Sequence, residues 1–113
     1  MRRLIESTFV TLGGDIGAPQ QWGPPYLFGP EQAEYSRALL FGADALLLGR
    51  KTYEGLSAGY TAIAAAGPGP TADFVVAMNA IPKYVASTTL TQAGWNATVL
   101  GADVPGEIAA LKQ

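Results

Sequence analysis

The chain contains neither cysteine nor histidine among its 113 residues. Their absence excludes disulfides, thiol nucleophiles, Ser-His-Asp arrangements and the usual zinc ligand sets, and we assign no metal ligand. Chemistry in which a cofactor carries the reactive group is compatible with this inventory, and hydride transfer from a nicotinamide is the leading example. The composition therefore allows a reductase without requiring one.

Charged residues are also scarce, with seven basic and nine acidic side chains and a net charge of −2. The chain has no basic block and no alternation of aromatic and basic residues, so we expect no nucleic-acid partner. No apolar run approaches the roughly 20 residues that span a membrane. Glu6 and Thr8 interrupt the start too early for a signal peptide. We expect no membrane partner and a cytoplasmic location.

The length and the apolar content of 49% fit one small domain over residues 1–113. A chain of this size has room for a single core and buries roughly two thirds of its unfolded surface.

The most informative stretch runs from an apolar segment into a basic turn. Residues 45–48 predict a strand buried on both faces, which is typical of α/β sheets, and Gly49 ends it. Thr52 is a suitable N-cap for a following helix. The free N–H groups of that helix would then meet Arg50 and Lys51, a geometry that can bind phosphate. Such turns are also common connectors in which both cations are merely solvated.

Local signals divide the rest of the chain into further elements. Alternating β-prone residues predict strands, and proline or glycine marks the ends of the helical segments. The sequence predicts strands at 4–12, 83–87 and 96–100, helices at 30–41 and 72–80, a helix starting at Asp103, a long loop at 13–29, and one or two helical turns after Thr52 followed by a loop to Pro70.

Residues 44–54, which read DALLLGRKTYE, resemble the second strand and following turn of the dihydrofolate-reductase-like family, in the branch of the RibD C-terminal reductase domain of riboflavin biosynthesis. Residues 4–12, 78–87 and 95–96 agree with that family in order and spacing. The resemblance implies an α/β fold with a mostly parallel sheet and flanking helices. In the family a further central strand and a glycine-rich turn follow, so this chain would hold the N-terminal portion only.

The same resemblance implies an NADPH-dependent reductase acting on a small pteridine or pyrimidine-like molecule, as in the riboflavin-pathway reduction of 5-amino-6-(5-phosphoribosylamino)uracil. The arginine and the hydroxyls would favour NADPH over NADH by binding the 2′-phosphate. Serine and threonine are also ordinary residues at strand ends. The cofactor-binding residues implied are Gly49, Arg50, Lys51, Thr52, Ser87 and Thr88.

Two acidic residues are the candidates for facing the substrate. In dihydrofolate reductases the equivalent helix supplies the acid that holds the pterin ring, so the resemblance implies Glu34, with Glu31 as its neighbour one turn earlier. A surface glutamate is the default explanation of either residue. Relatives usually read Thr-Leu-Asp-Gly after the first strand, whereas this chain has Gly13 at the acidic position and the acid displaced to Asp15. Asp15 would have to reach back to replace it.

The absent strand would leave backbone N–H and C=O groups unpaired at an internal sheet edge, and such edges pair with other chains. We therefore expect a homo-oligomer. The alternative to a reductase is a non-catalytic nucleotide-binding or oligomerisation module, impaired in catalysis by the truncation.

Overall fold

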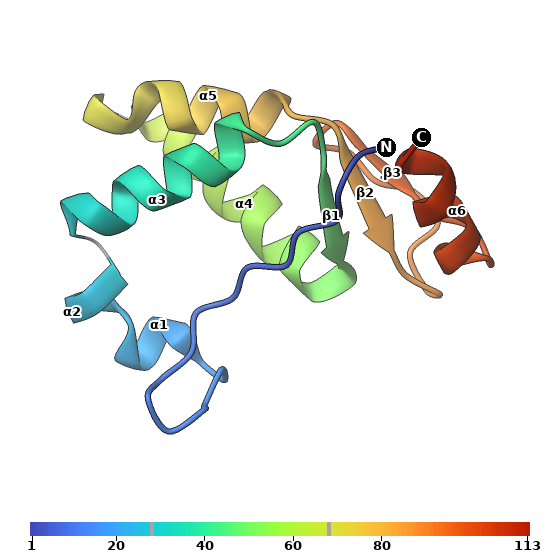
Figure 1. Ribbon diagram of the computed structural model, residues 1–113. Coiled ribbons are helices and arrows are strands. Elements are labelled where there is room, and N and C mark those ends of the chain that lie inside the picture. Colours follow the sequence, from blue (N-terminus) through green and yellow to red (C-terminus); the bar gives the residue numbers. More distant parts are fainter. Residues whose placement is uncertain (28, 68) are drawn as a thin grey trace.

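The computed structural model of the chain describes residues 1–27, 29–67 and 69–113. It has a mixed α/β architecture, as predicted, with one three-stranded sheet and flanking helices (Figure 1). In chain order the elements are α1 (Pro19–Trp22), α2 (Pro24–Leu27), α3 (Pro30–Phe41), β1 (Leu46–Gly49), α4 (Arg50–Ala66), the 3-10 helix η1 (Gly69–Thr71), α5 (Ala72–Ala80), β2 (Lys83–Ala86), β3 (Ala97–Val99) and α6 (Val104–Leu111).

The sheet has the order β1-β2-β3, and both neighbouring pairs are parallel. Leu46 pairs with Lys83 and Gly49 with Ala86, so β1 and β2 start and end level with each other. Parallel strands need a crossover connection, and α4 and α5 provide it between β1 and β2. The two strands therefore present their carboxyl ends at one edge of the sheet.

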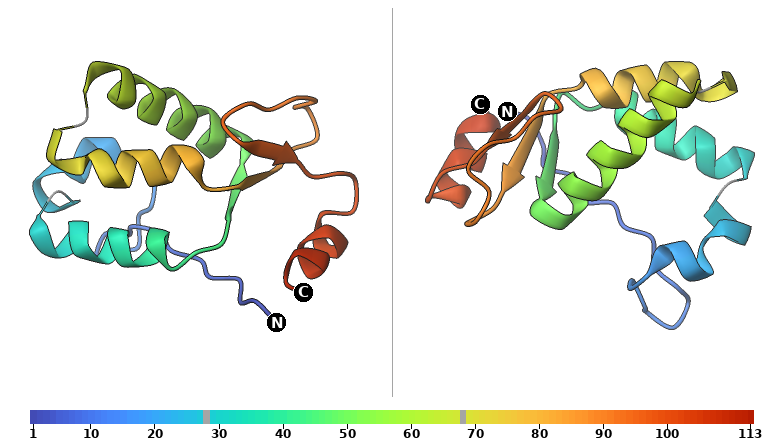
Figure 2. Two further views of the ribbon diagram at one scale, coloured as in Figure 1. Left: turned by 90° about the horizontal axis from the view of Figure 1, so that it is seen from above. Right: turned by 180° about the vertical axis from the view of Figure 1, so that it is seen from behind.

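Helix α4 packs on one face of β1 and β2, and α5 packs in turn on α4 (Figure 2). Because side chains alternate between faces, Leu46 and Leu48 share the covered face with Val85, which is fully buried. Leu47 points to the other face and remains 37% exposed. The prediction that this apolar run is buried on both faces is therefore wrong, because the helices that pack on β1 lie on one side of it.

An aromatic cluster joins α4, α5 and the loop that precedes β3. The Tyr53 hydroxyl accepts a hydrogen bond from Gly94 N–H at 2.9 Å and lies 3.2 Å from the Gly94 carbonyl oxygen. The Trp95 ring stacks on Tyr60, with centroids 6.4 Å apart, and its indole N–H donates to Asn79 Oδ1 at 2.6 Å. These contacts fix the crossover helices against the sheet.

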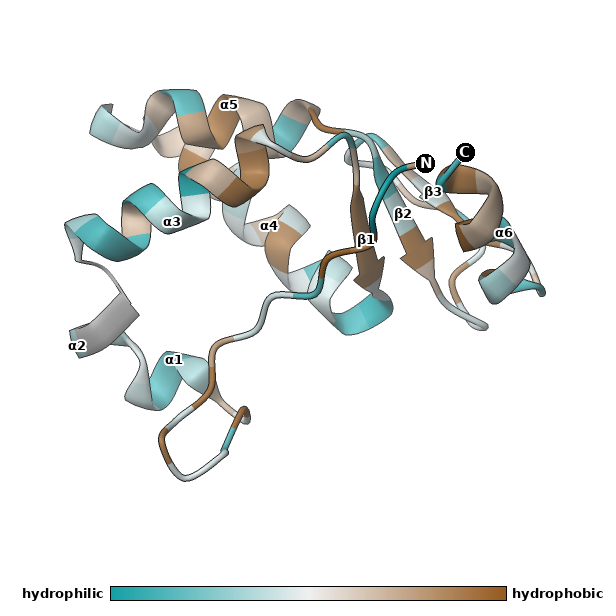
Figure 3. Cartoon of the chain, in the orientation of Figure 1, coloured by the Kyte–Doolittle hydropathy of each residue, from teal (hydrophilic) through white to brown (hydrophobic). Residues whose placement is uncertain are grey.

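Residues 4–12 do not form the predicted strand. They lie outside the helices and strands, and almost all of them are exposed. Their β-prone pattern specifies a strand only when a neighbour supplies hydrogen bonds, and β1 is the edge strand of the sheet in the described part of the chain. Figure 3 shows apolar residues spread along this segment.

Helix α4 runs for 17 residues to Ala66, rather than one or two turns after Thr52. Tyr53 and Tyr60 anchor one side of this helix, and the alanines at its end have the highest helix propensity. The helix begins at Arg50 with Gly49 as its N-cap, so the prediction of Thr52 as N-cap is wrong.

The other local predictions are mostly confirmed. The helices at 30–41 and 72–80 have the predicted bounds, and Asp103 caps α6 by accepting from Gly106 N–H. The loop predicted at 13–29 contains the short helices α1 and α2, each beginning with proline. Phe28 in that loop and Pro68 in the predicted loop before Pro70 lie outside the described residues.

None of the helices within the described ranges combines the length and the apolar content required to cross a membrane.

Tyr53→Phe tests the aromatic cluster. The substitution removes the hydroxyl that contacts both backbone groups of Gly94 and leaves the ring in place. We expect the free energy of unfolding to fall by about 0.5–1.5 kcal/mol, the net contribution of an ordinary hydrogen bond, because Gly94 is exposed and its N–H can bind water instead. Urea denaturation measures the change. Tyr35→Phe removes a hydroxyl from an exposed ring and should cost almost nothing; equal losses in the two variants would contradict the assignment.

Candidate functional site

The carboxyl edge of β1 and β2 brings together the two segments that were predicted to bind a cofactor. The register pairs Gly49 with Ala86, so Arg50 and Ser87 leave neighbouring strands at the same level. Helix α4 begins directly at this edge (Figure 1). We call the surface formed by Gly49, Arg50, Lys51, Thr52, Ser87 and Thr88 the carboxyl edge.

The N-terminus of α4 supplies backbone donors to the carboxyl edge. Its N-cap is Gly49, which has no side chain to accept from the first N–H groups. The first four N–H groups of a helix have no partner within the helix, and a 17-residue helix adds the positive end of its dipole. Thr52 and Lys51 are exposed in the first turn. An oxyanion could satisfy these donors.

Arg50 already has a partner within its own helix. Its Nη1 lies 3.1 Å from Oε1 and 3.2 Å from Oε2 of Glu54, one turn along. Both side chains are about half exposed, and such pairs contribute 0–1 kcal/mol. Among the contacts of the described residues, the guanidinium is thus held by Glu54 rather than by Ser87 or Thr88.

Ser87 closes the turn that follows β2. Its hydroxyl oxygen accepts N–H groups from Thr89 at 3.3 Å and Leu90 at 3.0 Å. A hydroxyl that accepts can still donate its own proton, and the Thr89 hydroxyl at 3.4 Å is one possible acceptor. Thr88 is exposed beside it. The turn therefore presents hydroxyls at the carboxyl edge with Ser87 held in a fixed position.

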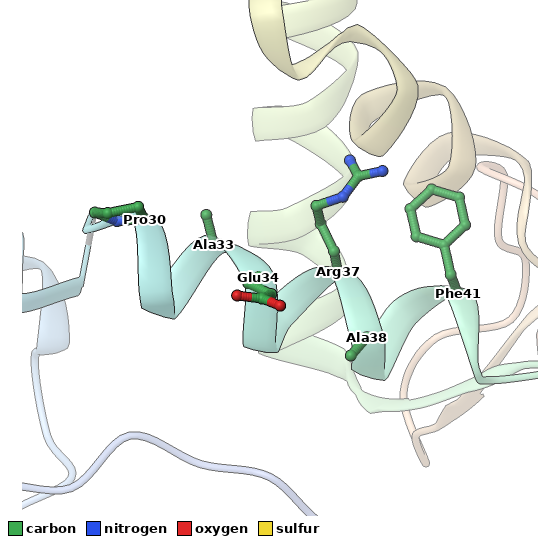
Figure 4. Close-up of a pocket in the computed structure, with 6 residues that line it drawn as sticks. All are labelled: Pro30, Ala33, Glu34, Arg37, Ala38 and Phe41. Atoms are coloured by element: carbon green, nitrogen blue, oxygen red, sulfur yellow. The ribbon is translucent and has the colours of Figure 1, made fainter.

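Glu34 lies on α3, away from the carboxyl edge. It is exposed and lines a shallow, open depression of about 550 Å³ with Pro30, Ala33, Arg37, Ala38 and Phe41 (Figure 4). All six residues come from one helix. α3 leads into the amino end of β1, at the other end of the strand from the carboxyl edge (Figure 1).

Arg37, the cation beside Glu34, forms an ion pair with a residue of another helix. Arg37 Nη2 lies 2.7 Å from Asp73 Oδ2, and its guanidinium carbon lies 5.0 Å from the centre of the Phe41 ring. The hydrogen bond from Arg37 lowers the pKa of the Asp73 carboxyl, which is at the surface. This arrangement joins α3 to α5, so the Arg37 guanidinium is already paired at the depression.

Asp15 organises its own loop. Its Oδ1 accepts the Gly17 N–H at 2.8 Å, and its N–H donates to Thr11 Oγ1 at 2.9 Å. The loop lies before α1, well separated from the sheet in both views of Figure 2. The structure thus brings the six predicted cofactor residues to one edge, and leaves Asp15 and Glu34 on two separate elements.

Lys83 was missed as a notable residue by sequence reasoning. Only 1% of it is exposed, and its ammonium donates to the carbonyls of Ile81 at 2.8 Å and Asn79 at 3.3 Å. The ammonium also lies 3.9 Å from the centre of the Trp95 ring. Burial lowers the pKa of Lys83. These contacts make it a structural cation that satisfies carbonyls at the end of α5.

A signal for this role was present in the sequence. Lys83 opens an otherwise apolar strand directly after a helix end and Pro82, where unpaired carbonyls need a donor. A lysine in that position is expected to turn back toward those carbonyls.

Comparison of the chain with protein families, with curated proteins and with solved structures gives no match. The geometry of the carboxyl edge therefore carries the functional argument.

The lowered pKa of Lys83 makes the free energy of unfolding depend on pH. As pH rises from neutral toward 10.0, the folded protein releases this proton before the unfolded chain does, so the unfolded chain binds more protons and the free energy of unfolding rises. Lys83→Met should remove that rise. Burial raises the pKa of Tyr60 above 10.0 and acts in the opposite direction at higher pH, so urea denaturation is measured below pH 10.0.

Lys51→Met is the matched control, because it removes an exposed lysine from α4. It should keep the rise in stability. If the rise persists in Lys83→Met, burial of this ammonium is not its cause.

Proposed function

We propose that the carboxyl edge binds the phosphate groups of a nucleotide, and that this nucleotide is NADPH, the cofactor of a reductase. The observation that carries the proposal is the pairing of Gly49 with Ala86, which sets the uncapped start of α4 beside the hydroxyls of Ser87 and Thr88. In open α/β sheets, ligands bind outside the carboxyl ends of the strands.

The donors of the carboxyl edge fit a phosphate by charge and by number. The first turn of α4 offers backbone N–H groups and the positive end of the helix dipole. Arg50 and Lys51 add two cations in the same turn, and Ser87 and Thr88 add hydroxyls without further charge. All of these groups favour a dianion over a neutral ligand.

The preference for NADPH follows from the arginine and from the family resemblance. A guanidinium can hold two phosphate oxygens at once, so Arg50 would bind the 2′-phosphate that NADH lacks. NADPH supplies a hydride when bound, and the residues of the carboxyl edge position it. The substrate proposed is a small pteridine or pyrimidine-like molecule, with Glu34 and Asp15 as the candidate acids.

A second function is a non-catalytic nucleotide-binding or oligomerisation module. It is favoured by the separation of Asp15 and Glu34, which lie on different elements and not at the carboxyl edge. This alternative retains the proposed phosphate-binding site and involves no catalysed reaction.

Thermal unfolding with millimolar NADPH tests the site. A ligand at about 100 times its dissociation constant adds roughly 2.7 kcal/mol, which raises the Tm of a domain of this size by about 10 °C. We expect this shift for the unmodified protein with NADPH, and a smaller one with NADH. Arg50→Ala should lose most of the shift because the guanidinium is the group that distinguishes the two nucleotides.

Arg3→Ala is the matched control. It also removes one exposed arginine, and its neighbour Arg2 pairs with Asp44 at the amino end of β1. This variant should keep the full shift. Absence of a shift in the unmodified protein would overturn the proposed function.

Glu54→Gln provides a test in the opposite direction. The substitution removes the carboxylate that competes with phosphate for Arg50. Because an exposed ion pair contributes at most about 1 kcal/mol, we expect the dissociation constant for NADPH to fall about two- to five-fold in calorimetric titration. Glu31→Gln removes an equal charge from α3 and should leave the affinity unchanged. Weaker binding in Glu54→Gln would contradict the role given to Arg50.

A further inference from the structure

The molecule exposes more surface than a folded monomer of its mass. Its accessible surface is 7892 Å² for 11.7 kDa, whereas a compact monomer of that mass exposes about 5,900 Å². Its radius of gyration is 15.0 Å, against about 13.3 Å for a compact domain of this length. The excess of about 2,000 Å² per chain corresponds to the area that one subunit buries in a large homodimer interface.

Much of the apolar part of this excess lies in residues 4–12. Ile5 is 62% exposed and Leu12 is fully exposed, and Leu4, Phe9 and Val10 are also open to solvent. Figure 3 shows the segment running as an extended chain outside the packed elements. It is rich in β-prone residues and carries a single charge, at Glu6.

The outer edge of β1 is open in the same region. Leu46 donates its N–H to the Pro82 carbonyl, so its backbone groups point toward β2. Because successive residues of a strand alternate, Leu47 directs its N–H and C=O to the outer side, where the sheet of the described residues has no further strand. An open edge of this kind pairs readily with another chain.

We propose that two copies of this chain form a strand-exchanged dimer, in which residues 4–12 of each copy pair with the outer edge of β1 of the other. Within one chain the segment is anchored only where it starts, by Arg2 N–H on the Lys112 carbonyl at 2.7 Å, and its far end makes a local turn in which Thr11 N–H donates to the Asp15 carbonyl at 2.9 Å. It does not join its own sheet.

The second copy fits in position, charge and area. The ion pair of Arg2 with Asp44 starts the segment beside the amino end of β1, so a twofold axis there lets each segment reach the partner strand. A net charge of −2 per chain opposes association only weakly. Two excess surfaces sum to about 4,000 Å², within the 2,000–5,000 Å² of obligate homodimers. The dimer does not rest on the proposed nucleotide site.

Disulfide trapping tests the exchange, because the natural chain has no cysteine. Leu47→Cys is combined with Ser7→Cys or with Thr8→Cys, which sample the two faces of the segment. We expect one of these pairs to give a covalent dimer on a non-reducing gel. Leu47→Cys with Ile16→Cys is the control and should stay monomeric. A disulfide within one chain, or no trapping by either pair, overturns the exchange.

Sedimentation equilibrium of the unmodified chain gives a second measurement at tens of micromolar concentration, where we expect a dimer. Ile5→Lys should raise the dimer dissociation constant at least tenfold, since it places a charge in the exchanged strand. Ile16→Lys is matched in exposure, 60% against 62%, and should leave the constant unchanged. A monomer of the unmodified chain, or equal behaviour of the two variants, overturns the proposal.

Discussion

The parallel pairing of β1 with β2 is the constraint on which the other features depend. Parallel neighbours cannot be joined by a tight turn, so the chain must cross over, and α4 and α5 form that crossover on one face of the sheet. The same pairing sets Gly49 level with Ala86 and brings the start of α4 beside the turn at Ser87. It also leaves Leu47 on the uncovered face. The carboxyl edge and the exposure of Leu47 thus both follow from the pairing of β1 with β2.

The aromatic cluster connects this sheet to the candidate site. Tyr53 lies in the first turns of α4, and its hydroxyl binds Gly94, in the loop that starts at Ser87. One side chain therefore ties the start of α4 to the loop between β2 and β3. The Lys83 ammonium lies over the Trp95 ring. The ring and the carbonyls of Asn79 and Ile81 offset the cost of burying the lysine charge. Among the described residues, no buried side-chain polar atom lacks a partner.

Sequence signals from neighbouring residues predicted the elements whose ends depend on those residues alone. The helices at 30–41 and 72–80 followed from proline and glycine at their ends. The grouping of Arg50 with Ser87 came from the family resemblance, and the parallel pairing of β1 with β2 sets the two residues at one edge of the sheet. Residues 4–12 could not be predicted in this way, because a β-prone pattern needs a partner that the sequence does not name. The length of α4 was missed for a related reason: glycines within it suggested a break, and packing of Tyr60 overrides them.

The pairing of Arg50 with Glu54 bears on which anions the carboxyl edge can select. An exposed ion pair holds the guanidinium near the start of α4 at little energetic cost, so a ligand must offer Arg50 more than Glu54 does. A phosphate dianion meets that condition, since it can accept two charge-assisted hydrogen bonds from the guanidinium and further bonds from the N–H groups of the helix. A single carboxylate only replaces one exposed pair with another. At the proposed binding site, competition from Glu54 would therefore favour phosphate esters over simple organic acids.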